Sequence, residues 1–315
     1  MSSVPGSAGH ASLDNPAMRW KLGLGALTAS WGFIAVLAAA VDLGAEPLAF
    51  WRLALAAGTL ALGAVIVGRP ALLAPRGRLP QLALLGAVQG AHWLLFFLAV
   101  KHGSVALAVL TFYAAPLILA AAAPLVLPER WSAPVLGAAS VGAVGIVLIA
   151  LGSDNGSASG WAVVAGLGSA ATYAALVVLS KRLLLAATPP LTVAFWDCFV
   201  GAIVVAPALL LADRVIPADA GEWGAILALG IVLTGVSTLL YTMLLRHVSA
   251  QAAGVLTFLE PVAGVLLAWA LVSEEPGQWT LAGGALVLAA GLVVVLLEPS
   301  ETRVADAPGG LGSSQ

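Results

Sequence analysis

Ten long apolar stretches run through this sequence, and they constrain its fold more than any other feature. A helix needs about 20 mainly apolar residues to cross the roughly 30 Å hydrocarbon core of a bilayer. Each stretch has about that length, and short polar or Gly/Pro-rich breaks separate them. We therefore predict an all-α integral membrane protein with ten transmembrane helices, at residues 20–41, 47–67, 80–100, 105–127, 131–151, 161–180, 191–212, 223–245, 250–272 and 279–297.

The composition excludes several other classes of protein. Hydrophobic residues make up 61% of the chain and charged residues 9%, whereas soluble domains carry roughly 25% charged residues. So few charges cannot cover a water-exposed surface. The net charge of -2 argues against a strongly basic nucleic-acid-binding protein. The single cysteine, Cys198, excludes a disulfide framework and a multi-thiolate metal site.

The positive charges predict the orientation in the membrane. Cytoplasmic loops of membrane proteins carry an excess of Lys and Arg. With alternating crossings, ten of the 13 basic residues fall on the side of the N-terminus: Arg19, Lys21, Arg69, Arg76, Arg78, Arg130, Lys181, Arg182, Arg246 and Arg303. We expect a multi-pass protein of the inner or plasma membrane whose segments 1–17 and 298–315 are disordered cytoplasmic tails. A cleaved signal peptide at 19–40 is the alternative for the first span.

The two halves of the chain repeat one another. Three short segments recur about 145 residues later, with 49–52, 101–104 and 109–112 matching 194–197, 246–249 and 255–258. A proline follows the last pair, and Glu129 corresponds to Glu274. We expect two repeats, 18–152 and 160–297, of five helices each. Because five is odd, the second repeat enters the membrane from the opposite side, as in transporters that alternate access to a midplane site.

These motifs resemble the EamA family of the drug/metabolite transporter superfamily. The matching residues are Ser30-Trp31-Gly32, Arg52, the segment 109–129, the segment 255–261 and Glu274. The resemblance implies ten helices in two halves and export of amino acids, metabolites or drug-like compounds, in some members driven by ion gradients. One departure is that Arg52 and Asp197 carry opposite charges at equivalent positions.

Ionisable residues inside the spans are the main candidates for function, because such groups usually face the bundle interior or a cavity. Glu260, directly before Pro261, could bind an ammonium group or a proton, or serve packing. His92 could titrate or hydrogen-bond a substrate, or join two helices. Arg52 could reach the outer interface or pair with Asp42 or Glu46. Asp197 could gate the inner face or pair with Lys181 or Arg182.

Aromatic residues and prolines complete the candidate site. Trp31, Tyr113, Tyr241 and Trp269 could line a substrate cavity and offer a face to a cation. Pro116 and Pro261 are expected to shape the fourth and ninth helices. Glycines of the fifth and tenth helices should allow close packing, within the chain or in a homodimer.

The predicted activity is secondary transport of a small organic solute, with export the favoured direction. No enzyme or nucleotide-binding motif is present, and we expect no cofactor, no metal and no nucleic-acid partner. The cavity should lie among the third, fourth, eighth and ninth helices, with contributions from the first and sixth. Proton coupling through Glu260 is the preferred drive, and facilitative or exchange transport is the alternative. An intramembrane enzyme acting on a lipid-dissolved substrate is the rival from another class.

The charge bias and the number of spans together predict cytoplasmic termini. Reporter fusions at Ser2 and Gln315 should both report the cytoplasm, and a fusion within 213–222 should report the outside. Termini on opposite sides of the membrane would contradict the inverted repeat.

Overall fold

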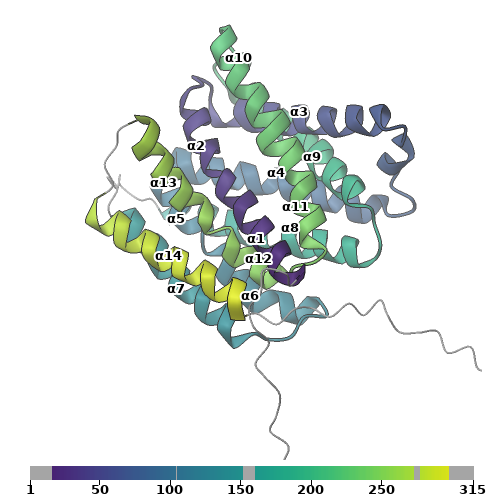
Figure 1. The fold of residues 1–315 in the computed structure, drawn as a ribbon. Helices are drawn as coiled ribbons and strands as arrows, with labels where there is room; N and C mark the ends of the chain where they lie inside the picture. The colour runs from purple at the N-terminus through teal and green to yellow at the C-terminus, as the bar shows by residue number, and fades with distance from the viewer. Residues whose placement is uncertain (1–15, 104, 152–159, 273–276, 298–315) are drawn as a thin grey trace, which may run out of the picture.

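The computed structural model describes residues 16–103, 105–151, 160–272 and 277–297. The predicted tails fall outside this range apart from residues 16 and 17, as do Glu274 and the 152–159 connection between the repeats. Within the described residues the chain forms helices joined by short turns and no strand (Figure 1).

All ten predicted spans are helical, several of them in two or three pieces. The first repeat contains α1 (Pro16–Ser30), α2 (Gly32–Ala39), α3 (Ala45–Ile66), η1 (Pro70–Leu73), α4 (Leu79–His102), α5 (Val105–Phe112), α6 (Ala115–Val126) and α7 (Ala133–Leu151). The second contains α8 (Gly160–Leu185), α9 (Pro190–Val205), η2 (Ala206–Leu211), α10 (Ala220–Leu227), η3 (Ala228–Val236), α11 (Ser237–Leu245), α12 (Ala250–Leu256), α13 (Leu259–Val272) and α14 (Gln278–Leu297).

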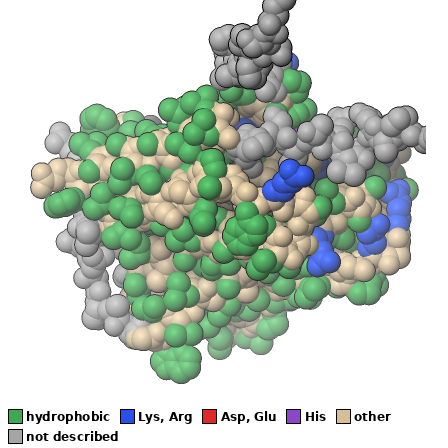
Figure 2. Space-filling view, turned by 90° about the horizontal axis from the view of Figure 1, so that it is seen from below, with side chains coloured by type: hydrophobic (Ala, Val, Ile, Leu, Met, Phe, Trp, Pro, Cys, Tyr) green, Lys and Arg blue, Asp and Glu red, His purple; other side chains and the backbone are tan. Residues whose placement is uncertain are grey.

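These helices fit a membrane by length and composition. In the described part of the chain, nine helical segments are long and apolar enough to cross a bilayer, and the shorter apolar stretch Ala133–Leu148 of α7 supplies the tenth. Large hydrophobic side chains stand exposed along the outside of the bundle, including Ile66 at 73% and Leu210 at 89%. Figure 2 shows one such face, covered by hydrophobic side chains with Lys and Arg gathered toward one side. A surface of this kind is stable in lipid. The predicted fold class is confirmed.

The packing of the helices follows the inverted repeat. The fifth and tenth spans, α7 and α14, lie against one another (Figure 1), and so do the second and seventh, α3 and α9. The contact between α4 and α9 has its counterpart between η3 and α3, and the contact between α4 and α8 has its counterpart between α11 and α1. Equivalent helices of the two halves thus occupy equivalent places around a pseudo-two-fold axis, which is the arrangement of inverted-repeat transporters.

The fourth and ninth spans are both interrupted at the same place in the repeat. The helix stops after Phe112 in one and after Leu256 in the other, and it resumes just before Pro116 and Pro261. A proline has no N–H to donate to the carbonyl four residues earlier. The Glu260 N–H instead donates to the Thr257 carbonyl at 3.2 Å. Both halves therefore place irregular backbone near the middle of the bundle.

A buried carboxylate joins the two repeats at the basic end of the bundle, where 67–78, 127–132, 186–189 and 246–249 lie. Glu129, 9% exposed, accepts hydrogen bonds from the Ala250 N–H at 2.7 Å and the Gln251 side-chain amide at 3.2 Å. This contact, which we name the Glu129 clasp, ties the end of the fourth span to the start of the ninth. It satisfies N–H groups that the first turn of a helix leaves unpaired.

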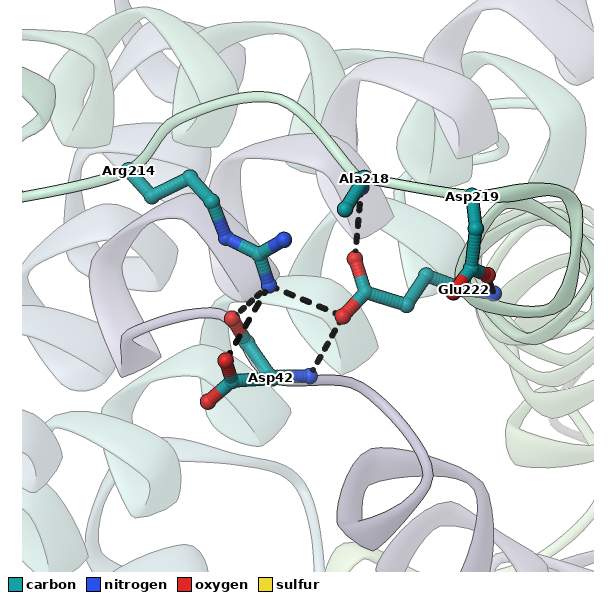
Figure 3. Close-up of polar contacts among 5 residues, drawn as sticks. All are labelled: Asp42, Arg214, Ala218, Asp219 and Glu222. Atoms are coloured by element: carbon teal, nitrogen blue, oxygen red, sulfur yellow. Dashed lines mark hydrogen bonds and ion pairs between the residues drawn. The ribbon is translucent and has the colours of Figure 1, made fainter.

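A second polar cluster closes the acidic end, where 40–44 and 212–219 lie (Figure 3). The Arg214 guanidinium contacts the Glu222 carboxylate at 2.8 Å and the Asp42 carboxylate at 3.6 Å. Glu222 also accepts from the N–H groups of Asp42 at 3.0 Å and Ala218 at 2.7 Å. This outer clasp connects the end of α2 to the start of α10, again across the two repeats.

Gly32 lets α2 touch α13 backbone to backbone. A β-carbon at residue 32 would lie 2.5 Å from the Gly264 nitrogen and 2.8 Å from the Ala263 carbonyl carbon. Because these are backbone atoms, they cannot turn aside as a flexible side chain would. The first span thus approaches the helix that carries Glu260 more closely than any residue with a side chain would permit.

Replacement of Gly32 by alanine should separate these helices and destabilise the protein. We expect Gly32→Ala to lower the unfolding free energy by roughly 1–3 kcal/mol, the cost of overpacking a tight contact, with a lower thermal midpoint in detergent. Gly58→Ala is the matched control, because a β-carbon there meets nothing within 4 Å. Equal midpoints for the two variants would show that the close approach carries no energy.

Candidate functional site

A cavity of about 180 Å³ lies at the centre of the bundle, between the two repeats. As predicted, helices of the first, third, fourth, sixth, eighth and ninth spans contribute to its wall. The second and seventh spans also line it, through Arg52, Leu53 and Asp197. The wall combines aromatic and aliphatic side chains with charged and hydroxyl-bearing ones, so it can bind both the apolar and the polar parts of a small organic ligand.

Glu260 projects into this cavity from the first turn of α13. Arg52 and Tyr113 line the same cavity. Arg52 forms no ion pair within 4.0 Å with any residue that the structure describes. A carboxylate and a guanidinium therefore face one cavity without neutralising one another by direct contact.

Arg52 is held in place by two neighbours. Its Nε–H donates to the Thr234 hydroxyl at 3.2 Å, and its guanidinium carbon lies 4.7 Å from the centre of the Trp93 ring. Only 7% of the residue is exposed. The expectation that Arg52 reaches the interface or pairs with Asp42 or Glu46 was wrong. Asp42 pairs with Arg214 instead, and the helical position of Arg52 turns its side chain inward.

The eighth span supplies Thr234 through an unusual backbone. Segment η3 is a π-helix, in which hydrogen bonds span five residues, and the Thr234 hydroxyl donates to the Leu229 carbonyl five residues earlier at 2.7 Å. π-helical turns are rare and occur frequently at functional sites. This local widening leaves the Thr234 oxygen available to accept from Arg52.

His92 joins the third span to the sixth. Its Nδ1 lies 3.0 Å from the Ser169 carbonyl oxygen and 2.9 Å from the Ser169 hydroxyl. Nδ1 donates to the carbonyl in the tautomer that carries its hydrogen there, and it accepts from the hydroxyl in the other tautomer. The rings of Trp93, Phe112 and Tyr173 surround the imidazole at centroid distances of 5.3 to 5.6 Å. His92 therefore combines the interhelical bond considered from the sequence with a place in the cavity wall.

Asp197 faces the same cavity from α9. Its Oδ2 accepts a hydrogen bond from the Gln89 side-chain amide at 3.3 Å. Lys181 donates to the carbonyls of Leu245 and Val248 at 3.0 and 2.8 Å. Asp197 forms no ion pair within 4.0 Å with Lys181 or Arg182, whereas its predicted role in gating the inner face stays a prediction.

Three of the four aromatic candidates line the cavity: Trp31, Tyr113 and Tyr241. The Trp31 indole N–H donates to the Ser237 hydroxyl, and its ring lies 5.6 Å from the Tyr241 ring. Trp269 does not belong to this group, because it is 50% exposed on the outside of the bundle. Nine residues separate it from Glu260, and at 3.6 residues per turn that spacing places it on the opposite face of α13.

Several wall residues were missed in the sequence. Thr234, Thr238, Thr242 and Ser180 line the cavity, yet isolated hydroxyl residues in apolar helices have no distinguishing pattern. The π-helical segment likewise has no local signal. Gln89 was not among the candidates, because its hydrogen bond to Asp197 requires α4 and α9 to be in contact.

A hydrated cavity should make its wall accessible to polar reagents. In a Cys198→Ser background, Thr238→Cys should react with a membrane-impermeant cationic thiosulfonate reagent, because Thr238 lines the cavity. Leu240 lies two residues later in the chain, at a lipid-facing position, and is 42% exposed. Leu240→Cys should stay unmodified because hydrocarbon excludes the reagent. Equal modification of both positions, measured by mass spectrometry, would contradict the assignment of the two faces.

Comparison with known proteins agrees with this architecture. The profile of the EamA-like transporter family matches residues 19–151 and again residues 160–296. A crystal structure of another protein superposes with a TM-score of 0.77 at 21% sequence identity, covering 89% of this chain and 98% of that one. This likeness shows the shared fold.

Named relatives include transporters from several bacteria. The pseudopaline exporter CntI of Pseudomonas aeruginosa is 29% identical over 252 residues, 80% of this chain and 86% of that protein. The probable terminal-alkyne amino-acid exporter of Streptantibioticus cattleyicolor is 25% identical over 92% of this chain and 97% of that protein. The uncharacterized transporter YwfM of Bacillus subtilis is 29% identical over 88% of this chain and 93% of that protein. With both repeats matched and a central cavity between them, the chain belongs to the EamA-like transporter family and is a multi-pass membrane transporter.

Proposed function

We propose that this transporter exports small zwitterionic, amino-acid-like solutes by alternating access, in exchange for protons. The observation that carries the proposal is the presence of Glu260 and Arg52 in the wall of one cavity. Opposite charges that do not pair directly can each bind the complementary group of a ligand. An amino acid carries both groups on one carbon.

The cavity provides a partner for each part of such a solute. The Glu260 carboxyl would accept the ammonium group, and the Arg52 guanidinium would bind the carboxylate through its fork of N–H donors. Tyr241 and Phe112, which line the same wall, offer apolar area and ring faces for the rest of the molecule. The volume of about 180 Å³ suits a solute of this size.

The names of relatives support the direction and the class of solute. Two relatives are named exporters, one of pseudopaline and one of a terminal-alkyne amino acid. The charge bias of the loops supports cytoplasmic termini in a plasma or inner membrane. In that orientation the basic end faces the cytoplasm, and the solute enters the cavity from there.

The two clasps supply a physical basis for alternating access. The Glu129 clasp connects the repeats at the basic end, and the outer clasp of Arg214, Glu222 and Asp42 connects them at the acidic end. Rocking of one repeat against the other would open one clasp while the other stays closed. The solute then reaches the cavity from one side at a time.

Proton coupling would arise from competition at Glu260. Transfer of a carboxyl away from water disfavours its charged form, so a proton can replace the ammonium group when the solute leaves. One residue then binds either a proton or a solute, which is the simplest scheme for an antiporter. Facilitative or exchange transport without protons would need no such competition.

Transport of unaltered solute distinguishes this proposal from an intramembrane enzyme. Proteoliposomes loaded with an unlabelled amino acid should take up the labelled compound in counterflow, and chromatography should recover the label unchanged. Chemically altered label would favour the enzyme.

The decisive variant is Glu260→Gln, which preserves the size of the side chain and removes its charge. We expect the variant to insert in the membrane, to lose uptake driven by a pH gradient, and to retain part of its counterflow, because exchange does not require a proton. Both assays use the same proteoliposome preparation. The matched control is Glu46→Gln at the start of α3, outside the cavity wall.

Unchanged gradient-driven uptake in Glu260→Gln would assign Glu260 to packing and contradict coupling at this residue. Absence of counterflow in the wild-type protein for every amino acid tried would contradict the proposed solute class.

A further inference from the structure

We propose that Asp197 forms a second cation subsite in the cavity, so that the transporter prefers solutes with two cationic groups and one carboxylate, such as a dibasic amino acid. The inference rests on the proposed function and names the solute class for the same cavity. It depends on the hydrogen bonding of Asp197, on the charges of the cavity wall and on the place of Asp197 in the repeat.

Asp197 has fewer partners than a buried carboxyl requires. The residue is 4% exposed, and Gln89 is the one donor that the structure places on its carboxyl, at Oδ2. The Oδ1 atom accepts no hydrogen bond from any described residue. Buried polar atoms are nearly always hydrogen-bonded, and an exception needs a functional or structural explanation.

The positive charges in the described part of the chain do not form an ion pair with Asp197. Among the described residues it forms no ion pair within 4.0 Å. Arg52 is held by Thr234 and Trp93, and Lys181 donates to two backbone carbonyls. A buried carboxylate without a counter-charge is costly. A cationic group that enters the cavity would remove that cost.

The charges of the cavity wall define a complementary solute. The wall carries two carboxyl groups, Glu260 and Asp197, and one guanidinium, Arg52. His92 contacts Ser169 and aromatic rings and pairs with no carboxylate that the structure describes, so we count it as neutral. A solute with two ammonium groups and one carboxylate matches these three charges one for one.

The inverted repeat sets the direction of this pattern. Arg52 lies seven residues after the first residue of α3, and Asp197 lies seven residues after the first residue of α9. At 1.5 Å per residue, each α-carbon lies about 10 Å inside its end of the bundle. In a helix as long as α3, the two α-carbons therefore differ in depth by about 11 Å. The solute carboxylate would therefore point to the acidic end and the second ammonium group to the basic end.

The neutral polar groups of the cavity wall suit an ammonium ion. Gln89 lies on α4, and the hydroxyls of Ser180, Thr238 and Thr242 line the same cavity. These side chains offer oxygen acceptors to the N–H bonds of an ammonium group. The Tyr241 and Tyr173 rings in this wall can contribute cation–π contacts.

Competition on the wild-type protein tests the inference without a mutation. Proteoliposomes would exchange labelled leucine against unlabelled lysine, ornithine, leucine, cadaverine or glutamate. We expect lysine and ornithine to compete at concentrations at least about tenfold lower than leucine, because one more buried charge pair is formed. Cadaverine lacks the carboxylate for Arg52 and should be weaker than lysine, and glutamate should be the weakest.

Variants of Asp197 then assign the preference to this side chain. Asp197→Asn should reduce the ratio of lysine to leucine exchange about tenfold or more, and Asp197→Glu should keep most of the preference because the charge is retained. The matched control is Asp213→Asn, the same substitution at an exposed residue of the acidic end, which should leave the ratio unchanged.

The possible outcomes distinguish failure of this inference from failure of the proposed function. Leucine exchange with no advantage for lysine would overturn the inference and leave the proposed function standing. An unchanged ratio in Asp197→Asn with loss of gradient-driven uptake would make Asp197 a proton site only, and it would also overturn the inference. Stimulation of leucine exchange by sodium that Asp197→Asn abolishes would assign the site to a metal ion. Exchange of none of the five compounds would overturn both proposals.

Discussion

The need to satisfy every backbone polar group inside a hydrocarbon solvent governs this structure. An unbroken helix pairs its backbone N–H and C=O groups within itself, but the interrupted fourth and ninth spans cannot pair all of theirs in this way. At the second interruption, the Thr28 hydroxyl of α1 donates to the Leu256 carbonyl at 2.8 Å, so another helix supplies the partner that the break removed. Irregular backbone is tolerated there because it is enclosed by the bundle. Tyr113 within the first break and Glu260 just after the second face the cavity instead of lipid.

Charged side chains buried in the bundle also need polar partners. At the two ends of the bundle, carboxylates are satisfied by backbone N–H groups and by Arg214, so the clasps are stable polar contacts between the repeats. In the cavity, Glu260, Arg52 and Asp197 lack such direct ion pairs with one another. The polar contacts at the two ends are thus complete within the protein, whereas the three charged groups of the cavity form no ion pair with one another. This division agrees with a transporter in which a solute or proton enters the midplane.

Much of the fold followed from local patterns, for reasons that are physical. The length of an apolar helix is set by the thickness of the bilayer, so the ten spans could be located from hydropathy alone. The shared motifs at 49–52 and 194–197 revealed the repeat because equivalent helices fill equivalent places. Glu260 and His92 were identified because ionisable residues in spans rarely face lipid. Trp269 was misplaced because an aromatic residue is stable both in a cavity and in lipid.

The sequence by itself determined the class, the number of helices, the inverted repeat and the residues whose charge demands an interior position, since each depends on local hydropathy or on repetition along the chain. Only the tertiary structure decided the partners of those residues. Arg52 meets Thr234 because a π-helical segment presents that hydroxyl. Asp197 meets Gln89 because α4 and α9 pack together. Such contacts join residues more than 100 positions apart, and their geometry depends on how whole helices pack, which no local pattern records.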